Sequence, residues 1–178
     1  MRIISGTLKG RKVLPPKGLP VRPTTDMSKE ALFNVLNNRV DFEEISVLDL
    51  FSGTGNISLE FASRGVTKLV AVDQNYKCCA FLSQMVNDFE LSGIQVVRDN
   101  VFKFIERTHE PFDLIFADPP YDLLELKEIP NKVFKSSLLK KEGMLILEHP
   151  SFQRFSEHAN FIETRKYGQS SFSFFKPI

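Results

Sequence analysis

The stretch Phe112-Asp-Leu-Ile-Phe-Ala-Asp-Pro-Pro-Tyr121 sets the frame for the rest of the chain. Its first six residues form an apolar run that predicts a buried strand, and the two prolines that follow predict an abrupt stop. Ligands of open α/β sheets bind outside the carboxyl ends of the strands. There, Asp118 and the outward carbonyl groups of Pro119 and Pro120 offer hydrogen-bond acceptors, and Tyr121 adds an aromatic face. This cluster is suited to binding the NH2 of a flat amine, although Asp-Pro-Pro also occurs in ordinary turns.

Strand and helix patterns alternate on both sides of this stretch, which predicts βαβ units and an α/β fold with a mostly parallel sheet. An amphipathic helix is expected from about residue 24, with Thr24, Thr25 and Asp26 as alternative caps. Further helices are expected at residues 56–64, 76–92, 101–107 and 131–140. The expected strands cover residues 45–50, 68–72, 94–98, 112–117 and 144–148, with a terminal hairpin at 161–167 and 171–176.

The composition, 42% hydrophobic and 25% charged over 178 residues, is typical of one soluble globular domain. No apolar run approaches the roughly 20 residues that span a bilayer, and the N-terminus lacks the apolar stretch of a signal peptide, so we expect a cytoplasmic protein. The adjacent Cys78 and Cys79 fit neither a redox motif nor a zinc site, and the three histidines are scattered. We therefore expect reduced cysteines and no metal.

The first 25 residues contain six basic residues and no acid, whereas the remainder has 17 basic and 22 acidic residues. Short apolar pairs around a glycine turn predict a hairpin, and five prolines and glycines after it predict a stiff linker. We divide the chain into this extension, residues 1–23, and a main domain, residues 24–178. A solvated hairpin face is one interpretation of the charge; contact with nucleic-acid phosphates is the other. The candidate contacts are Arg2, Lys9, Arg11, Lys12 and Arg22.

A second candidate site is the loop Asp49-Leu-Phe-Ser-Gly-Thr-Gly-Asn56, which joins the first expected strand of the sheet to a helix. Its two glycines allow a sharp turn and close approach of a ligand. Asp73 ends the next strand 20 positions after Gly53, where an acid can bind ribose hydroxyls. Ser58 stands where a dinucleotide loop has its third glycine, and Asp49 would repel a pyrophosphate but attract an ammonium group.

The ligand of this loop is therefore expected to be S-adenosylmethionine, which has an amine and no phosphate, in preference to a nicotinamide dinucleotide. Asp99 follows the third strand, where it could accept from an adenine amino group beside the backbone of Asn100 and Val101. A simple helix N-cap is the alternative interpretation of Asp99.

These motifs together resemble the class I S-adenosylmethionine-dependent methyltransferases that act on exocyclic amines. The flanking stretches Met1-Arg-Ile-Ile-Ser-Gly-Thr-Leu-Lys-Gly-Arg-Lys12, Arg22-Pro-Thr24, Lys29-Glu-Ala-Leu-Phe-Asn34 and Tyr167-Gly-Gln are similar to the bacterial 16S ribosomal RNA guanine-N2 methyltransferases of guanine 966. The resemblance covers nearly the whole chain. It implies a Rossmann-like fold with a seven-stranded sheet, and 16S rRNA or the small ribosomal subunit as partner of a monomeric enzyme.

The resemblance also implies a role for each matching residue. Asp118, Pro119, Pro120 and Tyr121 would bind the target amine and its base. The cofactor would be held by Asp49, Phe51, Ser52, Gly53, Thr54, Gly55, Asp73, Gln74, Asp99, Asn100 and Val101. Residues 122–130 match no recognition element, which leaves RNA selection to the N-terminal extension.

Two other functions remain open from the sequence, and two more are disfavoured. The same acceptor cluster would serve an adenine-N6 methyltransferase on RNA or DNA. A protein-amide methyltransferase usually has Asn at the position of Asp118, and a nicotinamide oxidoreductase is disfavoured by Ser58 and Asp49. A non-catalytic RNA-binding module would bind RNA in a salt-dependent way without transferring a methyl group.

Overall fold

The computed structural model of the chain describes residues 1–19 and 24–178. Its strands form one sheet of seven in the order β3-β2-β1-β4-β5-β7-β6. Strands β1 to β5 run parallel, and β7 is antiparallel to both of its neighbours, β5 and β6. The strands are β1 Ser46–Leu50, β2 Lys68–Asp73, β3 Ile94–Arg98, β4 Phe112–Ala117, β5 Leu139–Pro150, β6 Phe161–Tyr167 and β7 Ser170–Phe175.

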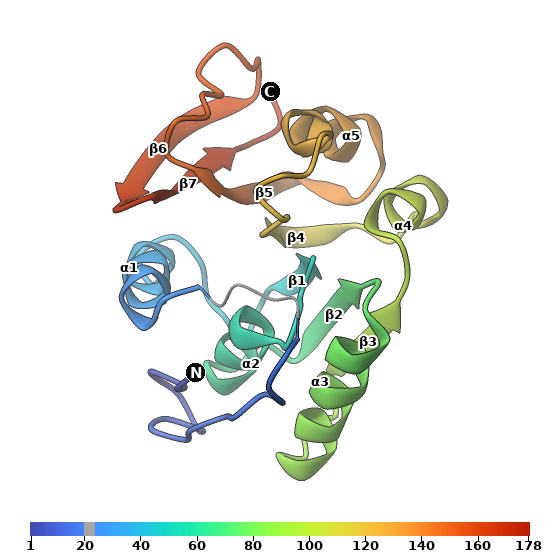
Figure 1. Ribbon diagram of the computed structural model, residues 1–178. Coiled ribbons are helices and arrows are strands. Elements are labelled where there is room, and N and C mark those ends of the chain that lie inside the picture. The colour runs from blue at the N-terminus through green and yellow to red at the C-terminus, as the bar shows by residue number, and fades with distance from the viewer. Residues whose placement is uncertain (20–23) are drawn as a thin grey trace.

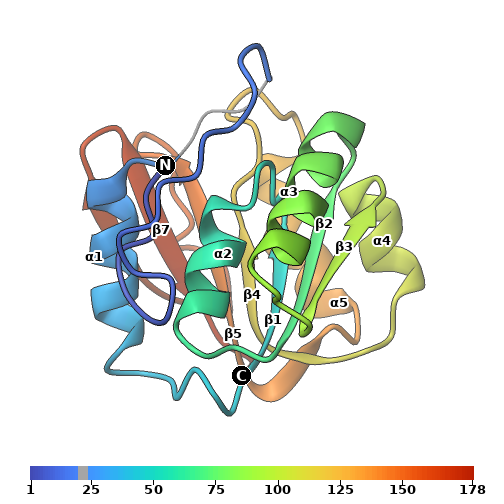
Figure 2. The same ribbon diagram turned by 90° about the horizontal axis from the view of Figure 1, so that it is seen from below.

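Helices cover both faces of the sheet (Figures 1 and 2). One face is covered by α1 Asp26–Leu36, α2 Asn56–Ser63 and α3 Tyr76–Asp88, and the other by α4 Val101–Arg107 and α5 Ile129–Lys135, which a single 3-10 turn, Leu126–Glu128, precedes. The expected fold class, an α/β sheet flanked by helices, is confirmed. Within the described ranges, every helix is too short or too polar to cross a bilayer.

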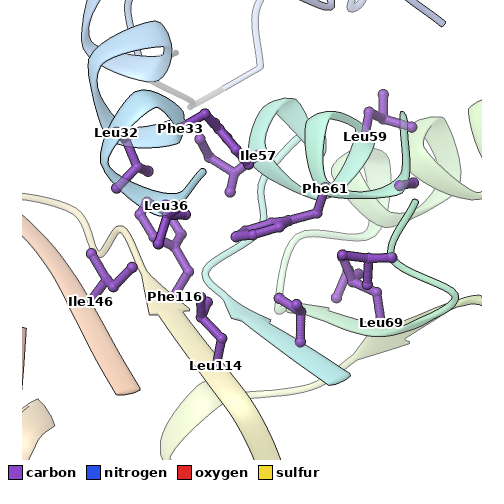
Figure 3. Close-up of a cluster of buried hydrophobic side chains, with 14 of the residues drawn as sticks. Leu32, Phe33, Leu36, Ile57, Leu59, Phe61, Leu69, Leu114, Phe116 and Ile146 are labelled. Atoms are coloured by element: carbon purple, nitrogen blue, oxygen red, sulfur yellow. The ribbon is translucent and has the colours of Figure 1, made fainter. Parts of the chain in front are cut away.

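The core is two apolar layers, one on each side of the sheet. Figure 3 shows the first, in which Phe33 of α1 packs edge-on against Phe61 of α2 with ring centroids 4.8 Å apart. Phe116 of β4 and Ile146 of β5 supply the sheet side of that layer. Burial of a side chain of this size contributes about 1.5–3 kcal/mol. These contacts hold α1 and α2 against this face of the sheet.

The boundaries of β3, α4 and β4 agree with the expected ranges, whereas the expected ends of two helices were wrong. The third helix ends at Asp88, and Glu90 adopts a left-handed φ of 55° that a helix cannot contain. The last helix covers Ile129–Lys135, because Leu139 already pairs with Phe112 of β4 and begins a long β5. Gly143 lies inside that strand, where a β-carbon would come within 2.8 Å of the Leu139 side chain.

The N-terminal segment, residues 1–19, is hairpin-like but contains one isolated bridge, Arg2 with Lys12, in place of paired strands. Its apolar residues Ile3, Leu8 and Val13 are buried in the same core layer as α2. Backbone contacts add to this packing: the amides of residues 4 and 5 donate to the Glu60 carboxylate at 2.9 and 3.1 Å. The first part of the segment is therefore attached to α2. Its assignment as a separate RNA-contacting unit stays a prediction.

Candidate active site

Four polar side chains lie at the edge of the sheet formed by the carboxyl ends of the parallel strands, on the face that α1 and α2 cover. Side chains alternate between faces along a strand. Val47, Phe116, Ile146 and Phe172 all belong to the layer under α1 and α2. The residues two positions nearer the edge therefore point to the same side. They are Asp49 of β1, Asp118 directly after β4, Glu148 of β5 and Ser170 of β7, from four neighbouring strands.

Asp118 begins the acceptor cluster beside the end of β1, since its amide donates to the Leu50 carbonyl at 3.3 Å. The hydroxyl of Thr24, just before α1, lies 3.4 Å from Asp118 Oδ2 and 3.1 Å from Glu148 Oε2. With one proton, this hydroxyl donates to one carboxylate at a time. The structure thus joins Asp118 to two residues that sequence reasoning missed.

The Tyr121 ring is held in place through its hydroxyl group. That hydroxyl lies 2.6 Å from Ser170 Oγ and donates to Glu148 Oε1 at 3.4 Å. Pro120 follows on the exposed side of the loop, and its carbonyl accepts from the amide of Leu123 at 3.0 Å. The predicted aromatic face is therefore anchored to β5 and β7, which are remote from it in sequence.

The glycine loop leaves the neighbouring strand, β1, at the same edge of the sheet. Phe51 has a left-handed φ of 62°, unusual for a bulky residue, and Gly55 has a φ of 81°. A β-carbon on Gly55 would lie 2.2 Å from Leu82 of α3, so only glycine fits there. The hydroxyl oxygen of Ser52 is buried with no hydrogen-bond partner among the described residues. A buried unpaired hydroxyl is costly, and a ligand in the loop would satisfy it.

Asp49 is 1% exposed, and its carboxylate accepts from the Ser58 hydroxyl at 2.5 Å. Burial raises the pKa of Asp49 to about 7, the Ser58 hydrogen bond opposes that rise, and the nearby Asp73 charge adds to it. Ser58, which replaces the third glycine of a dinucleotide loop, is thus the residue that satisfies Asp49. A carboxylate poised near neutral pH is a good partner for a ligand ammonium group.

Asp73 ends β2 and organises the loop through both of its oxygens. Oδ2 accepts from the Gly53 amide and Oδ1 from the Asn75 amide, each at 2.8 Å. A carboxylate oxygen retains a second lone pair, which can accept from a ribose hydroxyl. The adjacent Gln74 is exposed at the same edge.

Asp99 follows β3 but does not cap α4, so the simple N-cap interpretation was wrong. The cap is Asn100, whose side chain accepts from the amides of Phe102 and Lys103. Asp99 Oδ1 accepts from the Asn100 amide at 2.9 Å. Its Oδ2 forms an ion pair with Arg107 at 2.7 Å that lacks hydrogen-bond geometry. Val101, the first residue of the helix, is buried.

Of the predicted RNA contacts, Arg2, Lys9, Arg11 and Lys12 are exposed, and the Arg11 guanidinium lies over the Phe89 ring, 5.1 Å from its centroid. Arg22 lies outside the described residues. Residue 1 comes close to the glycine loop, because its sulfur lies 3.8 Å from the Thr54 hydroxyl. The basic segment therefore begins beside the glycine loop.

The two cysteines, Cys78 and Cys79, are free and buried in α3, and burial raises the pKa of both thiols. Thiols of raised pKa are weak nucleophiles, and both cysteines are reduced, as expected. In the described part of the chain, no three His, Cys, Asp or Glu side chains gather as metal ligands would.

Comparison with known proteins gives a consistent picture. A solved structure described as the putative methyltransferase yhhF from Escherichia coli superposes with a TM-score of 0.87 at 27% identity, covering 99% of this chain and 97% of that one. The putative rRNA methyltransferase YlbH of Bacillus subtilis is 31% identical over 183 residues, or 99% of this chain and 98% of the relative. Ribosomal RNA small subunit methyltransferase D of Escherichia coli strain K12 is 29% identical over 148 residues, or 83% of this chain and 74% of the relative.

The sheet order, the glycine loop and the acidic strand ends, with these likenesses, define a Rossmann-like methyltransferase. The family model that matches residues 1–176 is described as Conserved hypothetical protein 95. The chain belongs to that family.

Proposed function

We propose that this protein transfers a methyl group from S-adenosylmethionine to the exocyclic N2 amine of a guanine in 16S ribosomal RNA, which by family resemblance is guanine 966. One observation carries the proposal: the acceptor cluster and the cofactor loop leave adjacent strands at one edge. The Asp118 amide donates to the carbonyl of Leu50, the last residue of β1, and the glycine loop leaves the strand at the next residue, Phe51. A base held at Asp118 would lie beside a methyl donor in the loop.

The residues of the loop fit S-adenosylmethionine. Asp49 would face the methionine ammonium, Ser52 offers a buried hydroxyl in need of a partner, and Asp73 would accept from the ribose hydroxyls. Asp99 and the Asn100 backbone would meet the adenine. The cofactor supplies an activated methyl group on a sulfonium.

The chain contributes positioning and electrostatics to the transfer. An aromatic amine is a poor nucleophile because its lone pair is delocalised into the ring. Acceptance of its two protons by Asp118 and the Pro119 carbonyl would turn the lone pair out of the ring plane and toward the methyl group. In the in-line step the N–C bond forms as the S–C bond breaks. The surplus amine proton leaves through Asp118 to solvent.

The target base must leave its stack to reach this edge, as bases do in other enzymes that modify them. Tyr121 would stack on the extruded guanine, and its hydroxyl contacts with β5 and β7 keep the ring in one orientation. The exposed basic residues of the N-terminal segment would contact phosphates on the flank of the cofactor loop. The substrate is therefore RNA that reaches both surfaces at once, either free or in the small ribosomal subunit.

The proposal is tested with ribosomal RNA and small subunits from a strain that lacks the protein, followed by mapping of the methylated atom. Asp118→Ala should lower kcat by about 10²-fold or more, since it removes an acceptor used in the transition state, and leave cofactor affinity within about twofold. Asp122→Ala, an exposed acid four residues further on, is the matched control and should keep parent activity.

Three results would overturn the proposal. Methyl incorporation at an adenine N6 would replace the target. RNA binding without incorporation would make the protein a binding module. Parent-level turnover by Asp118→Ala would remove that residue from the mechanism.

A further inference from the structure

Glu148 is a buried carboxylate beside the half-buried Asp118. The pairing of Ala117 of β4 with Leu147 of β5 places the next residues of the two strands, Asp118 and Glu148, side by side on one face. Glu148 is 3% exposed, and both carboxylates lie within 3.4 Å of the same hydroxyl oxygen, that of Thr24. A single amine needs only the acceptors already assigned to Asp118 and Pro119. The second carboxylate therefore calls for a chemical role of its own.

The two oxygens of Glu148 are oriented by different hydroxyl groups. Thr24 lies 3.1 Å from Oε2, and Tyr121 donates to Oε1 at 3.4 Å. Thr24 is itself fixed, because its carbonyl accepts from the Asn56 side chain at 3.0 Å and Asn56 accepts from Lys29 at 2.8 Å. The carboxylate plane is thus set before any substrate arrives, as expected of a recognition group.

Guanine and adenine differ in what they present next to the reacting amine. The Watson–Crick edge of guanine has the N1–H donor beside the N2 amine, so two neighbouring donors face the protein. The corresponding edge of adenine has an N1 lone pair beside its amine. Two adjacent carboxylates match the first pattern, whereas the second pattern would bring a lone pair against a negative charge.

We propose that Glu148 is the residue that selects guanine, by accepting the N1–H of the base while Asp118 accepts from the N2 amine. This inference rests on the proposed function and adds to it the basis of base choice. Glu148 acts on recognition alone and takes no part in the transfer step.

The test uses small subunits reconstituted with ligated RNA that carries either guanine or 2-aminopurine at the mapped target. 2-Aminopurine keeps the methyl-accepting amine but has an N1 lone pair in place of N1–H. The parent should prefer guanine by about 10- to 100-fold in kcat/KM, the range expected for one lost charge-assisted hydrogen bond. Glu148→Gln, whose amide can donate to that lone pair, should bring the two substrates within about threefold of each other.

Glu142→Gln is the matched control, because Glu142 lies on the same strand with its side chain in solvent, and this variant should keep the parent preference. A parent that methylates both bases equally overturns the inference without any variant, and so does a Glu148→Gln protein that keeps the parent preference. If Glu148→Gln does not fold, Thr24→Val supplies the same comparison, since loss of the hydroxyl that orients Oε2 should reduce the preference. A parent that methylates neither base contradicts the proposed function instead.

Discussion

At the scale of single residues, Asp49 is a buried carboxylate whose burial lowers the stability of the folded protein when it is ionised. An ionised carboxylate in an enclosed, apolar environment is disfavoured, and the pKa of about 7 expresses that cost. A cofactor ammonium beside it would favour the ionised form. Cofactor binding near neutral pH should therefore release a proton from this residue.

Asp49→Asn tests this role through its pH dependence. For the parent, we expect cofactor affinity to increase as the pH rises from 6 to 8, because Asp49 ionises across that range; for Asp49→Asn, affinity should be weaker and flat. Isothermal titration calorimetry in buffers of different ionisation enthalpy measures both the affinity and the released proton. Equal pH profiles for the two proteins would exclude Asp49 as the ammonium partner.

The same substitution should have the opposite effect on the stability of the ligand-free protein. A folded-state pKa above the unfolded value of 3.8 means that the folded parent holds an extra proton between about pH 4 and 7, and its stability falls as the pH rises through this window. Asp49→Asn stays neutral throughout. Its melting temperature relative to the parent should therefore be higher at pH 8 than at pH 5.

At the scale of elements, the boundaries that depend on a local sequence pattern could be predicted. The boundaries that depend on pairing between strands could not. The apolar run of β4 and the helical pattern of α4 are local, and both ends of these elements were expected correctly, although the cap of α4 is Asn100 and not Asp99. The start of β5 at Leu139 depends on its pairing with Phe112, which no local pattern shows. For the same reason Glu148 looked like an ordinary strand end. Only the strand order places it beside Asp118.

The glycine loop is an element whose sequence requirement can be measured. Gly55→Ala should weaken cofactor binding by at least tenfold and lower the free energy of unfolding by about 1–3 kcal/mol, because the added methyl group meets Leu82 and the residue keeps a φ of 81°. Gly18→Ala is the matched control, with the same φ of 81° and open space around the β-carbon. Urea unfolding and cofactor titration of both variants separate the steric effect from the backbone effect. Equal losses in the two would show that the contact with Leu82 is unimportant.

At the scale of the whole molecule, Lys29 joins three regions. Its ammonium donates to the Arg2 carbonyl at 2.6 Å and to the Asn56 side chain at 2.8 Å, and it lies 3.4 Å from Glu60. Glu60 in turn accepts from the backbone of the N-terminal segment. Burial lowers the pKa of Lys29, and the charge of Glu60 opposes that effect. The Lys29 side chain thus contacts both the N-terminal segment and Asn56 at the start of α2, and Asn56 in turn donates to the Thr24 carbonyl.

Lys29→Met should disconnect these regions. We expect a loss on the order of 3 kcal/mol in the free energy of unfolding, because Glu60 is left buried with one ionic partner, Arg64. Hydrogen exchange at the amides of Ile4 and Ser5 should accelerate more than exchange in β4. Lys103→Met, at an exposed position on α4, should change neither quantity. Unchanged exchange at the N-terminal amides would show that the segment is held by its apolar contacts alone.

Side chains alternate between the two faces of the sheet along β1, β4, β5 and β7. A residue of the site and a core residue two positions away therefore lie on the same face, so the position of one depends on that of the other. Each polar group at the edge has a core residue of the same strand two positions away, such as Phe116 below Asp118 and Ile146 below Glu148. In β4 or β5, a residue inserted or deleted between the acid and its core neighbour would turn either the acid away from the site or the Phe116 or Ile146 side chain out of the layer beneath α1. Such a change of alternation would abolish activity without any substitution in the site. A substitution at the edge, in contrast, can change which base is accepted and leave the packing of the core intact.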